Sequence, residues 1–94
     1  MTLSKVNTLI DFPLDDLDLT PYMSPFRQSL NYKYELFAVA NHIGELRGGH
    51  CFSFCKNSQN GHWYKFDDEN ITPLNIRNVV TRDAYLLFYI QKSN

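Results

Sequence analysis

The stretch GGHCFSFCKNSQNGHWYKFDD, residues 48–68, decides the fold of this chain. Each half alternates apolar and polar side chains with the period of two that is typical of a half-buried β-strand. This alternation places His50 on the same face as the phenylalanines of the first strand, and it separates Asp67 from Asp68 in the second. Residues 57–61, NSQNG, have the composition of a turn, because Asn tolerates and Gly favours a positive φ. The pattern therefore predicts a β-hairpin.

Two registers of this hairpin are compatible with the sequence. A two-residue turn on Asn60 and Gly61 carries His50 past the carboxylates. A longer loop, closed by Lys56 and Gly61, places His50 directly opposite Asp67. The Cβ atoms of directly opposed residues lie ~5 Å apart, so only the second register brings an imidazole within hydrogen-bonding reach of a carboxylate.

Composition limits the classes of protein to consider. A chain of 94 residues is at most one domain, and 44% hydrophobic with 15% aromatic residues indicates a folded rather than a disordered chain. A formal charge of −1 predicts no nucleic-acid partner and no anionic membrane surface. No apolar run approaches the ~20 residues of a membrane span, and the first residues lack the apolar core of a secretion signal. We expect a protein of the cytoplasm, the nucleus or both.

The two cysteines predict neither a disulfide nor a zinc site. Cys51 and Cys55 are four residues apart on one predicted strand, which separates them by ~13 Å, too far for a disulfide. The chain has no C-x-x-C pair of the kind that holds structural zinc. No metal and no other cofactor is predicted.

Outside the hairpin, three further segments have a readable pattern. Residues 6–12 and 32–42 are expected to form strands, and residues 84–90 a strongly apolar strand that is central and buried. The segment 70–81 is ambiguous, because Ile76, Val79 and Val80 have the spacing of one or two helical turns.

The histidines are the candidate catalytic bases. A histidine that faces a carboxylate is two-thirds of a nucleophilic triad, in which the acid orients the imidazole and the imidazole activates a thiol or hydroxyl. His50 is the best candidate, His62 is expected at the surface beside a turn, and His42 fits either a substrate-orienting or a loop-bonding role. Cys51 is expected to point away from His50, and Cys55 lies too far along the strand. The sequence therefore offers a base and an acid without a nucleophile.

Gly48 and Gly49 precede the candidate base and have two interpretations. They fit a bulge or tight turn, and they fit equally a place where the backbone of an extended ligand passes close to the protein.

Five ordered motifs resemble the C-terminal, His-box half of the catalytic domain of the ubiquitin-specific proteases, which are papain-like ubiquitin carboxyl-terminal hydrolases. The motifs are Tyr34-Glu35-Leu36, Asn41-His42-x-Gly44, Gly48-Gly49-His50, Trp63-Tyr64-x-Phe66-Asp67-Asp68 and Ala84-Tyr85-x-Leu87-Phe88-Tyr89. The resemblance implies an α+β, mostly β fold: an antiparallel sheet that corresponds to the palm of the protease domain, with little helix. It also implies that residues 1–94 form a single partial domain without the Cys-box half.

The resemblance assigns a role to each residue of the candidate site. His50 matches the general base, Asp67 the acid that orients it, and Asp68 a neighbouring polar residue of the catalytic group. The match of Asp67 selects the longer-loop register. Cys51 stands where the family usually has an aromatic residue. The residues expected beside the substrate, the Gly-Gly tail of ubiquitin, are Gly48, Gly49, Cys51 and His42.

The implied activity is hydrolysis of the isopeptide or peptide bond after the C-terminal glycine of ubiquitin, through a thioester. The implied partners are ubiquitin or ubiquitinated proteins. Two arrangements of the Cys box stay open: these residues are a piece of a longer protease, or a separate chain of a split enzyme carries the Cys box. We expect the 94-residue chain alone to be inactive, because it lacks the nucleophilic cysteine. The alternative is an inactive fragment that binds ubiquitin or another protein.

The resemblance also predicts an uncovered apolar face, since the helical half of the family's domain packs on one face of this sheet. We expect Phe37, Phe52, Phe54 and Tyr85 to be exposed in the isolated chain, which would then associate with itself.

Overall fold

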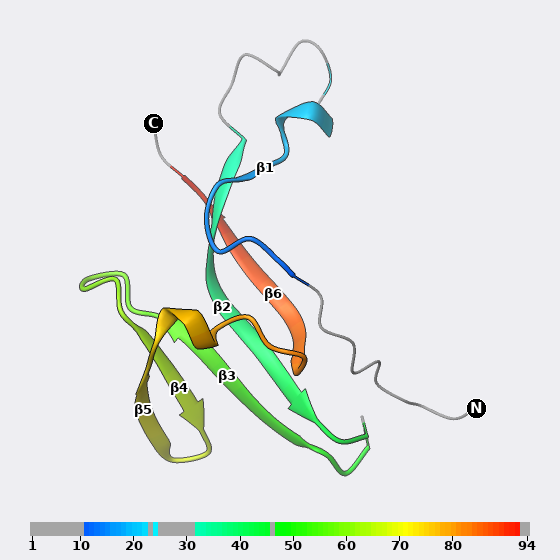
Figure 1. Ribbon diagram of the computed structural model, residues 1–94, viewed down its shortest axis with the longest axis vertical. Coiled ribbons are helices and arrows are strands. Elements are labelled where there is room, and N and C mark those ends of the chain that lie inside the picture. The colour runs from blue at the N-terminus through cyan, green and yellow to red at the C-terminus, as the bar shows by residue number, and fades with distance from the viewer. Residues whose placement is uncertain (1–10, 23, 25–31, 46, 93–94) are drawn as a thin grey trace.

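A computed structural model describes residues 11–22, 24, 32–45 and 47–92 of the chain (Figure 1). Its elements in chain order are β1 (Leu17–Asp18), η1 (Thr20–Tyr22), β2 (Lys33–Ile43), β3 (His50–Lys56), β4 (Trp63–Asp67), β5 (Asn70–Leu74), η3 (Ile76–Asn78) and β6 (Ala84–Gln91). The strand predicted at residues 6–12 lies outside the described residues except for its last two positions, which are not in a strand.

The described strands form one antiparallel sheet in the order β1-β2-β3-β4-β5, with β6 paired to β2. The long strand β2 is its centre, because it pairs with β1, β3 and β6. The strands expected at 32–42, at both halves of the hairpin and at 84–90 are all present. The prediction of a mostly antiparallel fold with little helix is therefore confirmed.

One face of the sheet carries the core. The register places Val39 beside Phe54, and the period-two alternation brings Phe52 and Trp63 to the same face. In Figure 1 the segment between η3 and β6 crosses the sheet over β2, and it contributes the fully buried Val79. The buried apolar side chains of the described residues are Phe12, Leu36, Val39, Phe52, Phe54, Trp63 and Val79.

The ambiguous segment 70–81 contains both a strand and a short helix. Residues 70–74 form β5, which Asp68 and Glu69 join to β4 in a two-residue turn. The helix expected from the spacing of Ile76, Val79 and Val80 is limited to the single turn of η3, where the Asn75 side chain accepts a hydrogen bond from the Arg77 amide. No helix in the described ranges has the length and apolar character needed to cross a membrane.

The predicted burial of residues 84–90 is wrong. Within the described part of the chain, β6 pairs with β2 alone, and its side chains are exposed or half-buried. The prediction of an exposed apolar face is correct for two of its four residues. Phe37 and Tyr85 are exposed, whereas Phe52 and Phe54 belong to the core. The exposed apolar residues on and beside β6, which we call the β6 apolar surface, are Phe37, Tyr85, Leu86, Leu87, Phe88 and Ile90.

Candidate active site

The β3–β4 hairpin brings the candidate base and acid together, in a register that differs from both predictions. Lys56 pairs with Trp63, and the loop between them is closed by a hydrogen bond from the Asn57 amide to the His62 carbonyl. The Asn57 side chain accepts hydrogen bonds from two loop amides, which stabilises this longer loop.

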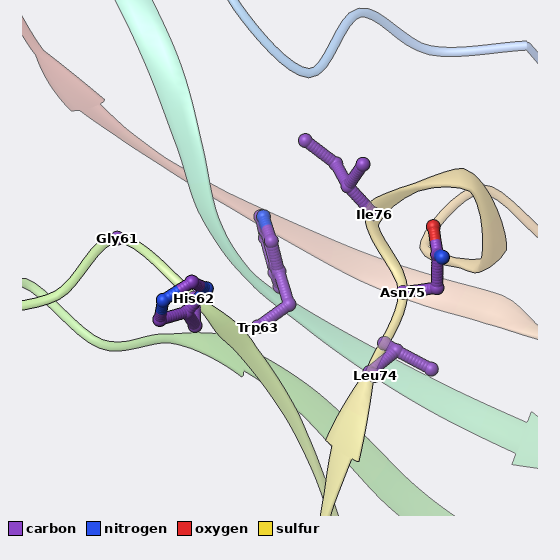
Figure 2. Close-up of a pocket in the computed structure, with 6 residues that line it drawn as sticks. All are labelled: Gly61, His62, Trp63, Leu74, Asn75 and Ile76. Atoms are coloured by element: carbon purple, nitrogen blue, oxygen red, sulfur yellow. The ribbon is translucent and has the colours of Figure 1, made fainter.

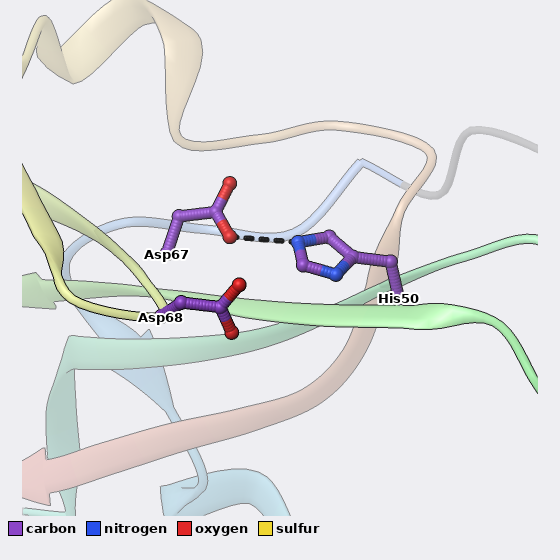
Figure 3. A group of neighbouring side chains, drawn as sticks. All are labelled: His50, Asp67 and Asp68. Atoms are coloured by element: carbon purple, nitrogen blue, oxygen red, sulfur yellow. Dashed lines mark hydrogen bonds and ion pairs between the residues drawn. The ribbon is translucent and has the colours of Figure 1, made fainter.

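The contact between His50 and Asp67 is therefore diagonal rather than directly across the strands. Continued along the strands, the observed register sets Asp67 opposite Phe52, with His50 two residues farther along the same face. Diagonal neighbours in a sheet are ~7–8 Å apart, a gap that long side chains span. His50 Nε2 and Asp67 Oδ1 are 2.7 Å apart, a hydrogen-bonding distance (Figure 3). The predicted juxtaposition is present although the predicted register is wrong.

Asp68 joins this pair because the strand ends at Asp67. Successive strand residues point to opposite faces, and the alternation alone separates the two carboxylates. Asp68 instead has φ of 53°, a left-handed conformation that Asp tolerates better than most residues. One oxygen from each carboxylate and one ring nitrogen of His50 all lie within 4.8 Å of one another. Figure 3 shows both carboxylates directed toward the imidazole.

The ring of His50 is supported by a residue that sequence reasoning left in a structural role. Phe52 stacks on it with ring centroids 6.1 Å apart and an angle of 21° between the planes. The Lys65 ammonium lies 4.9 Å from the centroid of the Phe52 ring. The sequence pattern could have predicted this stacking, since Phe52 follows His50 by two residues and therefore lies on the same face of the strand.

Gly49 lies against the chain's own backbone. A Cβ atom at this position would be 2.4 Å from the Glu45 carbonyl oxygen, the Ile43 carbonyl oxygen and the His42 Cε1 atom. Gly49 therefore makes a close approach to the chain's own backbone, and its expected place beside the ubiquitin tail stays a prediction. His42 is buried, and its ring faces that of Tyr85 at 6.4 Å between centroids. The His42 ring therefore lies between Gly49 and the Tyr85 ring and contacts both.

The remaining predicted site residues differ in exposure. Gly48 is in an exposed turn with φ of 76°, and no heavy atom lies within 4 Å of a Cβ built there. Cys51 is an exposed free thiol. It lines a shallow groove of about 470 Å³ together with Phe66, Asp68 and Tyr85. The sheet alternation puts Cys51 on the face opposite His50, as predicted.

A second cavity, of about 350 Å³, lies at the other end of β4 and is separate from the His–Asp pair. Figure 2 shows it between the start of β4 and the end of β5, with Trp63 between His62 and Ile76 and with Leu74 at the end of β5. His62, which was predicted to be a surface residue, is exposed at its rim.

These features define a class of protein. An imidazole that contacts a carboxylate on an antiparallel sheet, with a second carboxylate beside it, resembles the base-and-acid part of a nucleophilic hydrolase site. A comparison with protein families gives a more specific assignment. The family described as ubiquitin carboxyl-terminal hydrolase matches residues 1–89, and the chain belongs to this family.

Similar sequences agree with that assignment. The chain is 45% identical to chicken ubiquitin carboxyl-terminal hydrolase 2 over 92% of its own length and 24% of the relative. It is 37% identical to human ubiquitin carboxyl-terminal hydrolase 43 over 97% of its length and 10% of the relative. The chain therefore spans a quarter or less of these relatives.

Solved structures share the fold. A chain in the structure of the yeast SAGA DUB module matches with a TM-score of 0.81 and 33% identity, over 96% of this chain and 19% of that one. A chain in the SAGA DUB module bound to monoubiquitin matches with a TM-score of 0.78 and 33% identity, over 93% of this chain and 19% of that one.

Proposed function

We propose that this chain supplies the histidine and aspartate of a Cys-His-Asp deubiquitinase. The reaction is hydrolysis of isopeptide or peptide bonds after the C-terminal glycine of ubiquitin. The observation that carries the proposal is the 2.7 Å contact between His50 Nε2 and Asp67 Oδ1. Family membership supports the reaction class, and the similar module bound to monoubiquitin supports ubiquitin as the partner.

The geometry assigns a task to each ring nitrogen. Nε2–H donates a hydrogen bond to the Asp67 carboxylate, and this contact favours the neutral tautomer whose Nδ1 is unprotonated. Nδ1 is then the nitrogen that takes the proton of an attacking thiol, and the nearby carboxylates stabilise the imidazolium that forms. Phe52 limits rotation of the ring on one side.

The thiol comes from outside these 94 residues. Cys51 is on the opposite face of β3, and Cys55 is five residues from His50, which is ~16 Å along a strand. Neither sulfur reaches Nδ1 while β3 is intact. The chain alone is therefore inactive, and a polypeptide that carries the family's Cys box completes the site.

Reconstitution tests this function. The chain is mixed with a separately produced polypeptide that contains the Cys-box half of chicken ubiquitin carboxyl-terminal hydrolase 2, and release of a fluorophore from the C-terminus of ubiquitin is followed. We expect turnover by the mixture and none by either part. Asp67→Asn should lower the rate about 10²- to 10⁴-fold, because the asparagine no longer holds the correct tautomer.

The matched control is His62→Ala, which removes an exposed histidine from the hairpin loop and should leave the rate unchanged. Reconstituted turnover that survives His50→Ala would exclude His50 as the base. Turnover by the chain alone that is lost in Cys51→Ser would show that the nucleophile is internal.

A further inference from the structure

The cluster of His50, Asp67 and Asp68 has the dimensions of a metal site. Zinc binds imidazole nitrogen and carboxylate oxygen at about 2.0–2.2 Å, so two ligands of a tetrahedral ion are about 3.4 Å apart. His50 Nε2 and Asp67 Oδ1 are 2.7 Å apart, and one ligand atom from each of the three residues lies within 4.8 Å of the other two. Side-chain movements of about 1 Å would bring all three to bonding distance of one ion.

The cluster is also open to the solvent and negatively charged. The side chains of His50 and Asp67 are 47% and 33% exposed, and Asp68 is exposed. Among the described residues, no lysine or arginine forms a salt bridge with either carboxylate. The nearby Lys65 ammonium lies over the Phe52 ring instead. An ion can therefore enter from the solvent without displacing a protein cation, and water can complete its coordination.

The donor set selects the ion. One imidazole nitrogen with two carboxylate oxygens suits zinc, whereas magnesium requires oxygen ligands in a near-octahedral arrangement and retains its water. The order of affinity for nitrogen and oxygen sites also places zinc and cobalt above manganese. The prediction of no zinc site is argued from the spacing of the cysteines, and these ligands are not cysteines.

We propose that His50, Asp67 and Asp68 form a site for a divalent transition-metal ion such as Zn²⁺, and that its occupancy switches off the base. The ion binds at Nε2, because this nitrogen faces Asp67. Once Nε2 donates its electron pair to the metal, the single proton of the neutral ring resides on Nδ1. Nδ1 then accepts no proton from a thiol. The inhibitory consequence rests on the proposed function, whereas the binding of the ion does not.

The test measures binding on the chain itself, where no hydrolysis is needed. Both cysteines are first changed to serine, so that a thiol cannot act as the ligand. Isothermal titration with Zn²⁺ should show one ion per chain, and Mg²⁺ should show no competition. Asp68→Asn and His50→Ala should each weaken binding at least about tenfold, whereas His62→Ala should not change it.

A second measurement determines which ring nitrogen of His50 carries the proton. Labelling the histidine side chains with ¹⁵N should show the Nδ1-protonated tautomer of His50 when Zn²⁺ is added and the Nε2-protonated tautomer without it. No saturable binding up to about 1 mM Zn²⁺, or binding that is unchanged in Asp68→Asn, overturns the proposal. Because these results do not depend on turnover, failed reconstitution would leave the metal site standing, and absence of binding would leave the hydrolase proposal standing.

Discussion

The substitution Gly49→Ala tests how the loop before His50 is held. The added methyl carbon would lie 2.4 Å from two carbonyl oxygens, of Glu45 and Ile43, and from the His42 Cε1 atom. These are van der Waals overlaps of about 1 Å, since such atoms are in attractive contact near 3.5–4.0 Å and repel strongly at 2.4 Å. Two of the three atoms are backbone, and the third belongs to a buried ring. The clash therefore moves the loop or the end of β3 rather than a flexible side chain.

The size of the effect follows from overpacking. Forcing an extra methyl group into a well-packed site costs typically 1–3 kcal/mol, and a clash with backbone belongs to the upper end of this range. The unfolding free energy of a small protein falls by about 1–3 kcal/mol per molar urea. We therefore expect the urea midpoint of Gly49→Ala to fall by roughly 1 M or more. The His50–Asp67 contact should loosen as well, because His50 is the next residue.

Urea unfolding followed by the fluorescence of Trp63 measures the first effect. The matched control is Gly48→Ala, where no atom lies within 4 Å of the new methyl group and only the positive φ of 76° is unfavourable. That conformation costs about 1–2 kcal/mol for a residue other than glycine. Equal midpoints for the two variants, or a more stable Gly49→Ala, would refute the packing argument.

Three further outcomes are expected. Tyr89→Phe should lower the unfolding free energy by about 1 kcal/mol in chemical denaturation, because the Tyr89 hydroxyl donates a 2.7 Å hydrogen bond to the Pro13 carbonyl. Burial raises the pKa of Tyr89, so its contribution is complete below pH 10.0 and is lost as the pH rises through the higher folded-state value. The hydrogen bond from Lys92 lowers the pKa of Asp15, so the stabilisation by this pair is present above pH 3.8 and is lost as the pH falls through the folded-state pKa. In thermal scans between about pH 5 and pH 2, the melting temperature of Lys92→Met should therefore fall less steeply with pH than that of the unchanged chain. Phe88→Lys should reduce self-association in light scattering, because it places a charge in the middle of the β6 apolar surface.

The faces of the central hairpin follow from the sequence, whereas its register does not. Strict alternation puts His50 and Asp67 on one face in any register that shifts by an even number of residues, and the observed register is of this kind. The register itself depends on the loop. Asn57 holds a loop that neither predicted closure describes, because its side chain bonds two amides that only the folded turn brings near.

Other features depend on contacts that a pattern does not contain. A strongly apolar run such as residues 84–90 predicts a strand but not which element covers it, and here the described residues leave β6 exposed. The approach of Asp68 to His50 depends on one backbone angle after the strand ends. The internal role of Gly49 depends on where residues 43–45 fold back, which no spacing within the chain predicts.

The two outer margins of the sheet differ in what they offer to another polypeptide. Pro73 in β5 is paired with Tyr64 in a non-hydrogen-bonded pair, where the amide of the β5 residue points away from the sheet. Proline has no amide hydrogen, so the edge has no donor at this position. That edge is short, and it lacks a backbone donor at Pro73, the fourth of its five residues. The outer side of β6 runs for eight residues without a proline. Among the described strands, β6 is therefore the edge that an added strand can pair with most readily.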